Sequence, residues 1–270
     1  MKKLALQVAA ISLLMVGSAS AADMRMPVKA PPAPVPVAVY NWTGCYVGAG
    51  GGYGMFDDES RLVQNFGGQI QTSLKNDNGG RGWFGTVQVG CDFQIGSNIV
   101  IGAFGDYDWS GIKGDMSIPS EGLVGEEKLK NSWAAGGRIG WIPWTNTQFL
   151  VYVSGGYSQA RFNQVNFAFA SDGDPSRLAL EKHTYKGWFI GAGYEYGLSW
   201  FAIPGLFWKT EYRFYDYRAD EVPIFFVPGG STVPIITERL SIDSRKFVQT
   251  IRTELVWRFN LGGGPLVARY

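Results

Sequence analysis

Eight segments in which apolar and polar residues alternate constrain this chain more than any other feature of its sequence. Alternation with a period of two is typical of β-strands, because successive side chains of a strand point to opposite faces of the sheet. The segments are rich in glycine and aromatic residues and cover residues 42–55, 83–94, 99–109, 131–142, 148–159, 186–197, 206–217 and 246–259. The pattern therefore predicts an all-β fold.

The connections between these segments alternate strictly between long and short. The long connections cover residues 56–82, 110–130, 160–185 and 218–245, and the short ones cover residues 95–98, 143–147 and 198–205. An outer-membrane barrel has this pattern, because its turns on the periplasmic side are short and its outside loops are long. We therefore predict a closed antiparallel eight-stranded transmembrane β-barrel, an up-and-down meander over residues 41–259.

The start of the chain has the features of a secretory signal peptide. Lys2 and Lys3 precede an apolar stretch over residues 4–16, and Ala19-Ser20-Ala21 supplies the small residues of a cleavage site. The alternative is a short transmembrane anchor, but a membrane span needs about 20 apolar residues and this stretch is shorter. We expect residues 1–21 to be removed on export and the mature protein to reach the outer membrane.

Two further segments do not continue the strand pattern. Residues 22–40 are rich in proline, which favours an extended polyproline II conformation, and we interpret them as a periplasmic leader. Residues 260–270 form a C-terminal tail after Phe259, where the alternation ends. Gly262-Gly263-Gly264-Pro265 argues against one unbroken strand up to Tyr270. Either aromatic residue could therefore end the assembly signal that such barrels carry.

Each segment has an apolar face and a face that mixes glycine with charged residues. Alternation alone does not say which face points inward, since a soluble barrel of the lipocalin type would bury its apolar face. Aromatic residues gather at the segment ends, as at the two interfaces of a membrane, and a charge facing lipid at the midplane would cost about 2–4 kcal/mol. We therefore place inside the barrel the charges Asp92, Asp106, Asp108, Arg138, Glu195, Lys209, Glu211, Arg213, Arg252 and Glu254.

These charges of both signs allow two interpretations. Eight strands leave an interior that side chains just fill, so we predict a plug of salt bridges that closes the lumen. The same residues could instead line a narrow ion path, and this alternative stays open at this point.

Several segments resemble a known family. The proline-rich leader runs into YNWTGCYVG at Tyr40–Gly48, and further matches are GCDFQ at Gly90–Gln94, GDYDW at Gly105–Trp109, GRIGW at Gly137–Trp141, EYRFYDY at Glu211–Tyr217 and VWRF at Val256–Phe259. The chain resembles, over about residues 22–270, the small eight-stranded outer membrane barrels of alphaproteobacteria, the opacity or surface-antigen proteins with an OmpA-like transmembrane barrel. The resemblance implies a role in envelope integrity and surface interactions. Some members of the family are credited with pore activity or haem binding.

The two cysteines, Cys45 and Cys91, lie near the periplasmic ends of the first two predicted strands, both on the predicted outer face. Because neighbouring antiparallel strands could place them opposite each other in an oxidising compartment, we hypothesise a cross-strand disulfide. The alternative is a pair of free thiols packed as small apolar residues against lipid. With His183 as the single histidine, no cluster has the spacing of a zinc site.

Charge and motif content limit the remaining functions. With 24 Lys and Arg against 23 Asp and Glu, the formal charge is +1, which argues against nucleic acid as a partner. No arrangement of a nucleophile with a base stands out, so we expect no enzymatic activity and no cofactor. The expected partners are outer membrane lipid and lipopolysaccharide, the barrel assembly machinery, and a surface ligand of the loops.

The function predicted from the sequence is thus a structural and surface role in the outer membrane. Two alternatives remain: a narrow porin-like ion channel, and a surface receptor for haem or a host molecule. His183, near Tyr185 in the third long connection, is the conceivable haem ligand of the second alternative.

Overall fold

The computed structural model describes residues 40–66, 69–72, 75–143, 146–200, 203–226 and 235–259. The predicted signal peptide, the leader up to residue 39 and the predicted C-terminal tail lie outside the described residues. Within the described ranges, no helix is long and apolar enough to cross a membrane.

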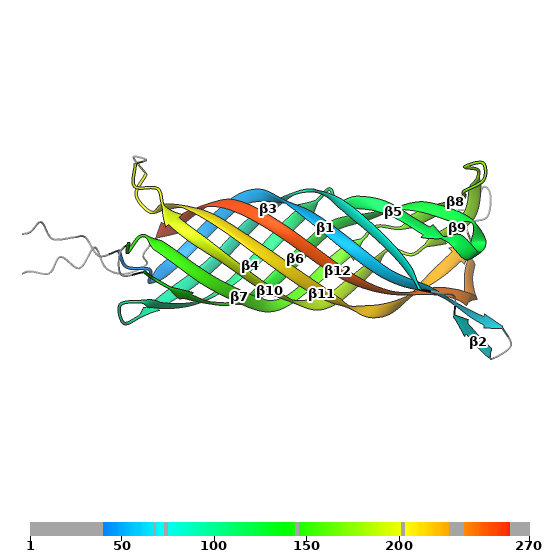
Figure 1. The fold of residues 1–270 in the computed structure, drawn as a ribbon, viewed down its shortest axis with the longest axis horizontal. Helices are drawn as coiled ribbons and strands as arrows, with labels where there is room; N and C mark the ends of the chain where they lie inside the picture. Colours follow the sequence, from blue (N-terminus) through cyan, green and yellow to red (C-terminus); the bar gives the residue numbers. More distant parts are fainter. Residues whose placement is uncertain are drawn as a thin grey trace, which may run out of the picture. The chain divides into compact units, whose positions relative to one another are not determined.

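Eight strands form a closed ring in which each strand runs antiparallel to its neighbours (Figure 1). The ring closes because the last strand pairs with the first, from Cys45 opposite Phe259 to Gln64 opposite Leu240. The predicted eight-stranded meander barrel is thereby confirmed. The strands in ring order are β1 (Gly44–Phe66), β3 (Asn76–Ile95), β4 (Ile99–Ser110), β6 (Leu123–Trp141), β7 (Phe149–Phe162), β10 (His183–Gly197), β11 (Leu206–Phe226) and β12 (Ile235–Phe259).

The register of the strands sets the width of the barrel. A path through directly paired residues that starts at Val47 passes once around the ring and returns to β1 at Asp57, ten residues farther along. Eight strands with this stagger are tilted by roughly 40° and enclose a lumen that side chains can fill. Bulky side chains that point inward therefore leave little empty volume in the lumen.

Shorter strands continue the barrel wall beyond β4, β7 and β10. They are β5 (Lys113–Ile118), β8 (Val165–Phe169) and β9 (Pro175–Leu180), while β2 (Gln69–Thr72) folds back on β1 and a single 3-10 turn covers Pro119–Glu121. β5 pairs with β3 and β6, β8 pairs with β6 and β9, and β9 pairs with β11. The wall thus stays closed well outside the segments that the sequence pattern picked out.

The expectation of long outside loops was therefore wrong for most of the residues concerned. One physical reason is that irregular pairing shifts the alternation. Leu129 and Ser132 are both buried although they differ in parity, because the register between β6 and β7 slips between Leu129 and Asn131. A second slip lies between Tyr217 and Asp220 on β11. A search for strict alternation therefore misses a strand that contains such a bulge.

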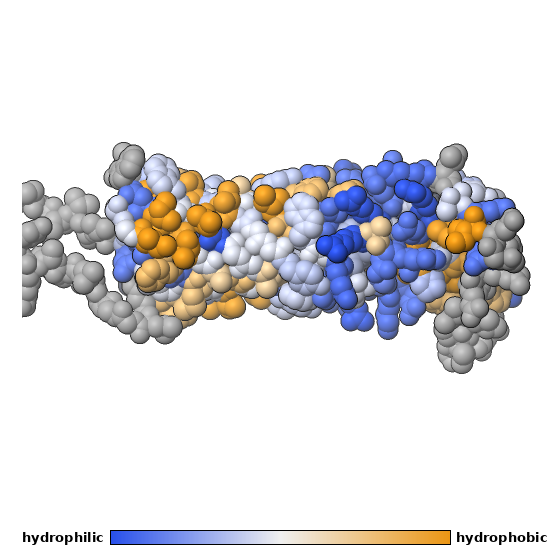
Figure 2. All heavy atoms as spheres, turned by 90° about the horizontal axis from the view of Figure 1, so that it is seen from below, coloured by the Kyte–Doolittle hydropathy of each residue, from blue (hydrophilic) through white to orange (hydrophobic). Residues whose placement is uncertain are grey.

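The outer surface of the barrel is divided along its length. Near the periplasmic end, where the short turns lie, an apolar belt covers the strands, and a hydrophilic region follows toward the other end (Figure 2). Exposed aliphatic side chains of the belt include Val89, Ile101, Ile139, Val153, Ile190 and Leu255. Exposed aromatic side chains flank them, with Phe93, Trp141, Trp208 and Trp257 on the periplasmic side and Trp83, Trp109, Trp133 and Trp188 on the outer side. This is the surface of a membrane-spanning barrel.

Candidate functional site

The interior of the barrel is the candidate functional site. The structure places all ten charged residues assigned to the lumen inside it, and each is at most 7% exposed. Four further charged side chains are equally buried, namely Asp58, Glu127, Lys246 and Arg258. Arg258 and Lys246 continue the alternation of Arg252 and Glu254, and Asp58 continues that of the first segment, so the pattern could have located them. The register slip near Leu129 interrupts the alternation, so the pattern could not have located Glu127.

The periplasmic third of the lumen holds a closed square of four charges. Arg138 contacts Asp92 and Glu195 at 2.5 Å each, and Arg258 contacts the same two carboxylates at 2.7 and 2.6 Å. The four residues come from β3, β6, β10 and β12, which are alternate strands of the ring. Each charge thus lies between two charges of opposite sign, and the square is neutral.

Aromatic rings enclose this square. The guanidinium carbon of Arg138 lies 4.6 Å from the ring centre of Tyr46, and that of Arg258 lies 4.6 Å from the ring centre of Trp42. Trp42 precedes β1 yet is only 1% exposed, and its indole nitrogen donates a hydrogen bond of 2.9 Å to the carbonyl oxygen of Thr147. The residues just before the first strand therefore cover the periplasmic mouth of the lumen.

The middle of the lumen contains a larger network. Lys209 donates to Gln88 at 2.5 Å and lies 3.3 Å from Glu254, while Arg213 lies 2.9 Å from Glu211. Across the lumen, Arg213 and Arg252 both reach Asp106, and Arg252 also reaches Asp108 at 2.9 Å. The charged residues of this middle network are Asp106, Asp108, Lys209, Glu211, Arg213, Arg252 and Glu254. It has one more carboxylate than cations.

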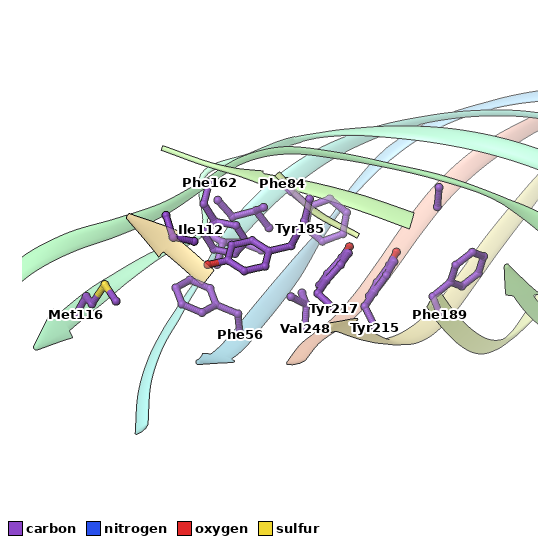
Figure 3. Close-up of a cluster of buried hydrophobic side chains, with 14 of the residues drawn as sticks. Phe56, Phe84, Ile112, Met116, Phe162, Tyr185, Phe189, Tyr215, Tyr217 and Val248 are labelled. Carbon is purple, nitrogen blue, oxygen red and sulfur yellow. The ribbon is translucent and has the colours of Figure 1, made fainter. Parts of the chain in front are cut away.

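A smaller cluster follows toward the outside. Lys246 lies 2.7 Å from Glu127 and 3.2 Å from Asp58, so two carboxylates share one cation. The rings of Phe162 and Tyr185 surround the ammonium group, with centres 4.7 and 5.1 Å from its nitrogen. These rings belong to the packed aromatic cluster that Figure 3 shows, which continues through Tyr217 and Tyr215 toward the middle network.

Two cavities lie near the ends of the barrel. A cavity of about 560 Å³ near the outer end is lined by Leu62, Asn76 and Ile118, and one of about 400 Å³ at the periplasmic end is lined by Tyr40 and Phe207, among other residues. The internal space beside Asp108 and Tyr215 measures only about 10 Å³. That volume is about the least that can hold one water molecule.

The cysteines and the histidine lie away from the lumen network. Cys45 and Cys91 are direct cross-strand partners on β1 and β3, and the structure joins them by a disulfide. His183 begins β10, where its Nε2 lies 2.9 Å from an Oδ2 of Asp220 and its ring packs edge-on against Tyr185. The imidazole is thus held by a neighbouring carboxylate and an aromatic ring.

Comparison with known proteins agrees with the closed barrel and its apolar belt. Residues 9–232 match the model of the outer membrane protein β-barrel domain. The chain belongs to this family. It is 32% identical over 197 residues to the 31 kDa outer-membrane immunogenic proteins of Brucella melitensis and Brucella suis, covering 71% of this chain and 79% of each relative. The family places the protein in the outer membrane of the cell.

Solved structures of other outer membrane proteins also match the chain. One is the outer membrane protein OprG from Pseudomonas aeruginosa, at 14% identity and a TM-score of 0.46, covering 82% of this chain and 98% of that chain.

Proposed function

We propose that this barrel has a structural and surface role in the outer membrane and that its lumen is closed by ion pairs. The observation that carries the proposal is the stack of charge clusters along the lumen, from the Arg138–Glu195 square through the Arg213 network to the Lys246 cluster. An ion would have to separate pairs in each cluster in order to pass. Since breaking a buried ion pair by removing one partner costs about 3–5 kcal/mol, such a path is unfavourable at several successive points.

The wall outside the membrane supports the surface part of the proposal. β5, β8 and β9 prolong the ring, so that paired strands extend beyond the apolar belt. Such a surface suits contact with molecules outside the cell, because binding residues are often found on segments that a folded scaffold positions. We also propose that the protein is not an enzyme, since the disulfide between Cys45 and Cys91 leaves neither thiol free as a nucleophile.

The experiment that tests the plug is planar-bilayer conductance of the purified, refolded protein. We expect no steady current from the wild type. The triple variant Arg138→Ala, Arg213→Ala and Lys246→Ala removes one cation from each of the three clusters, and we expect it to conduct. Its current should be cation-selective, because the variant leaves carboxylates in excess in the lumen.

The control is the triple variant Arg61→Ala, Lys75→Ala and Lys182→Ala, which removes three exposed cations from positions outside the lumen. It should stay as silent as the wild type. Steady current through the wild-type barrel that the lumen variant alters would contradict the plug and favour the narrow channel.

A further inference from the structure

Five strands carry an exposed cation just outside the outer aromatic residues. In β3 and β10 the cation lies two residues farther from the periplasm than an aromatic residue, as Arg81 does relative to Trp83. In β7 and β11 the separation from the aromatic residue is four residues. In β6 the cation lies three residues beyond Trp133, at the register slip between Leu129 and Asn131. The five cations are Arg81, Lys130, Arg161, Lys186 and Arg218, here called the cation ring.

The depth of the cation ring follows from strand geometry. Two to four residues of a strand tilted by roughly 40° correspond to roughly 5–10 Å along the barrel axis. The aromatic residues of such a barrel mark the interface of the hydrocarbon core. The cations therefore lie at the depth of the lipid headgroups, which occupy the first several ångströms outside that core. Figure 2 shows the corresponding change from the apolar belt to the hydrophilic region.

The cations of the ring differ from two other exposed cations at a similar height. No ion pair joins any of the five cations to another residue in the part of the chain that the structure describes. By contrast, Lys113 and Arg245, at a similar height on β5 and β12, are paired with Glu126 at 2.9 Å and with Asp216 at 2.6 Å.

Acidic residues lie farther outside on the same strands. Asp77 follows Arg81 outward on β3, Glu126 follows Lys130 on β6, and Asp220 follows Arg218 on β11, all on the exposed surface. On these three strands the exposed charge changes sign beyond the cation ring, and two of the acids have basic partners of their own, since Glu126 pairs with Lys113 and Asp220 with His183.

We propose that the cation ring binds the phosphate groups of the glycolipid in the outer leaflet and so fixes the height of the barrel in the membrane. Lys130, Arg161 and Lys186 form its densest part, because Arg161 pairs with Asn131 beside Lys130 and Gln159 on the same strand pairs with Lys186. Three unpaired cations on adjacent strands suit a headgroup with more than one phosphate, since each adds its own attraction to the anionic surface.

The test is native mass spectrometry of the refolded, detergent-solubilised protein titrated with bis-phosphorylated lipid A. The test variant is Lys130→Gln, Arg161→Gln and Lys186→Gln together. The matched control, Arg61→Gln, Lys75→Gln and Lys182→Gln, removes the same charge from exposed positions farther out. Circular dichroism checks that both variants fold. We expect the test variant to bind about tenfold more weakly or worse, and the control to bind as the wild type does.

Two further arms identify the source of the phosphate. In the first, dephosphorylated lipid A is added to the wild type, and it should bind as weakly as phosphorylated lipid A binds to the test variant. In the second, excess inorganic phosphate competes with the bound lipid, and it should displace little of it. Equal weakening in the control, unchanged binding by the test variant, or full displacement by inorganic phosphate would each overturn the proposal.

Discussion

Arg213 on β11 and Asp106 on β4 lie on opposite strands of the ring, yet a hydrogen bond of 2.7 Å joins the guanidinium Nη1 to the carboxylate Oδ2 across the lumen. The two residues are 107 positions apart in the sequence. The contact shows that the lumen is narrow enough for single side chains to bridge it. The barrel is thereby braced from the inside as well as by its backbone hydrogen bonds.

The cross-lumen pair should contribute strongly to stability. Replacing Arg213 by alanine leaves Asp106 and Glu211 with one cation fewer in a water-poor interior, so we expect the free energy of unfolding to fall by about 3–5 kcal/mol. Urea unfolding of the protein refolded into vesicles measures it. Arg61→Ala, on the exposed surface, should change the value by no more than about 0.5 kcal/mol. Equal effects of the two substitutions would refute a bracing role for the pair.

The periplasmic mouth should depend on Trp42. Its ring is 1% exposed and lies against Arg258, so Trp42→Ala should cost about 3–5 kcal/mol of unfolding free energy and leave that arginine open to water. The same urea titration gives the loss. Trp200→Ala provides the comparison, because that indole is 66% exposed and its removal leaves no internal cavity. If Trp42→Ala lowers the free energy of unfolding by no more than Trp200→Ala does, Trp42 is not packed firmly against the periplasmic mouth of the lumen.

The link between Cys45 and Cys91 can be tested chemically. We expect a shift in electrophoretic mobility of the unfolded protein on reduction, and two thiols that can be alkylated only after reduction. The double variant Cys45→Ser and Cys91→Ser should still fold into membranes, because β1 and β3 pair along 17 residues on each strand from Gly44 opposite Asp92 to Ser60 opposite Asn76. Unchanged mobility together with two reactive thiols before reduction would show that the protein carries free cysteines.

Glycine at the lumen wall makes room for larger neighbours. A Cβ atom at Gly52 would lie 2.6 Å from the ring of Phe84 and 2.2 Å from the carbonyl oxygen of Ile251, whereas at Gly85 the nearest atom would be 3.9 Å away. Gly52→Ala should therefore destabilise the barrel by about 1–3 kcal/mol through overpacking, and Gly85→Ala should be nearly neutral. Unfolding in urea separates the two. Similar midpoints for both variants would show that the wall adjusts more easily than the packing suggests.

Strand identity and side-chain direction were readable from the sequence. In a strand, neighbouring side chains point to opposite faces whatever lies farther away, so alternation alone assigned Asp92, Arg138 and Glu254 to one face. The concentration of tryptophan at segment ends then indicated which face meets lipid. The eight strands of the ring follow from these local properties, and the structure confirms them.

The partners of the lumen charges were decided only by the tertiary structure. Asp92 contacts both Arg138 and Arg258, because the stagger of ten residues around the ring brings these positions of β3, β6 and β12 to the same height in the lumen. No local pattern contains that stagger, which arises when the sheet closes. The burial of Glu127 and the continuation of the wall through β5, β8 and β9 likewise depend on register slips and pairings between distant segments. Within the eight alternating segments the sequence thus determined which residues face inward, and closure of the barrel determined which of them meet.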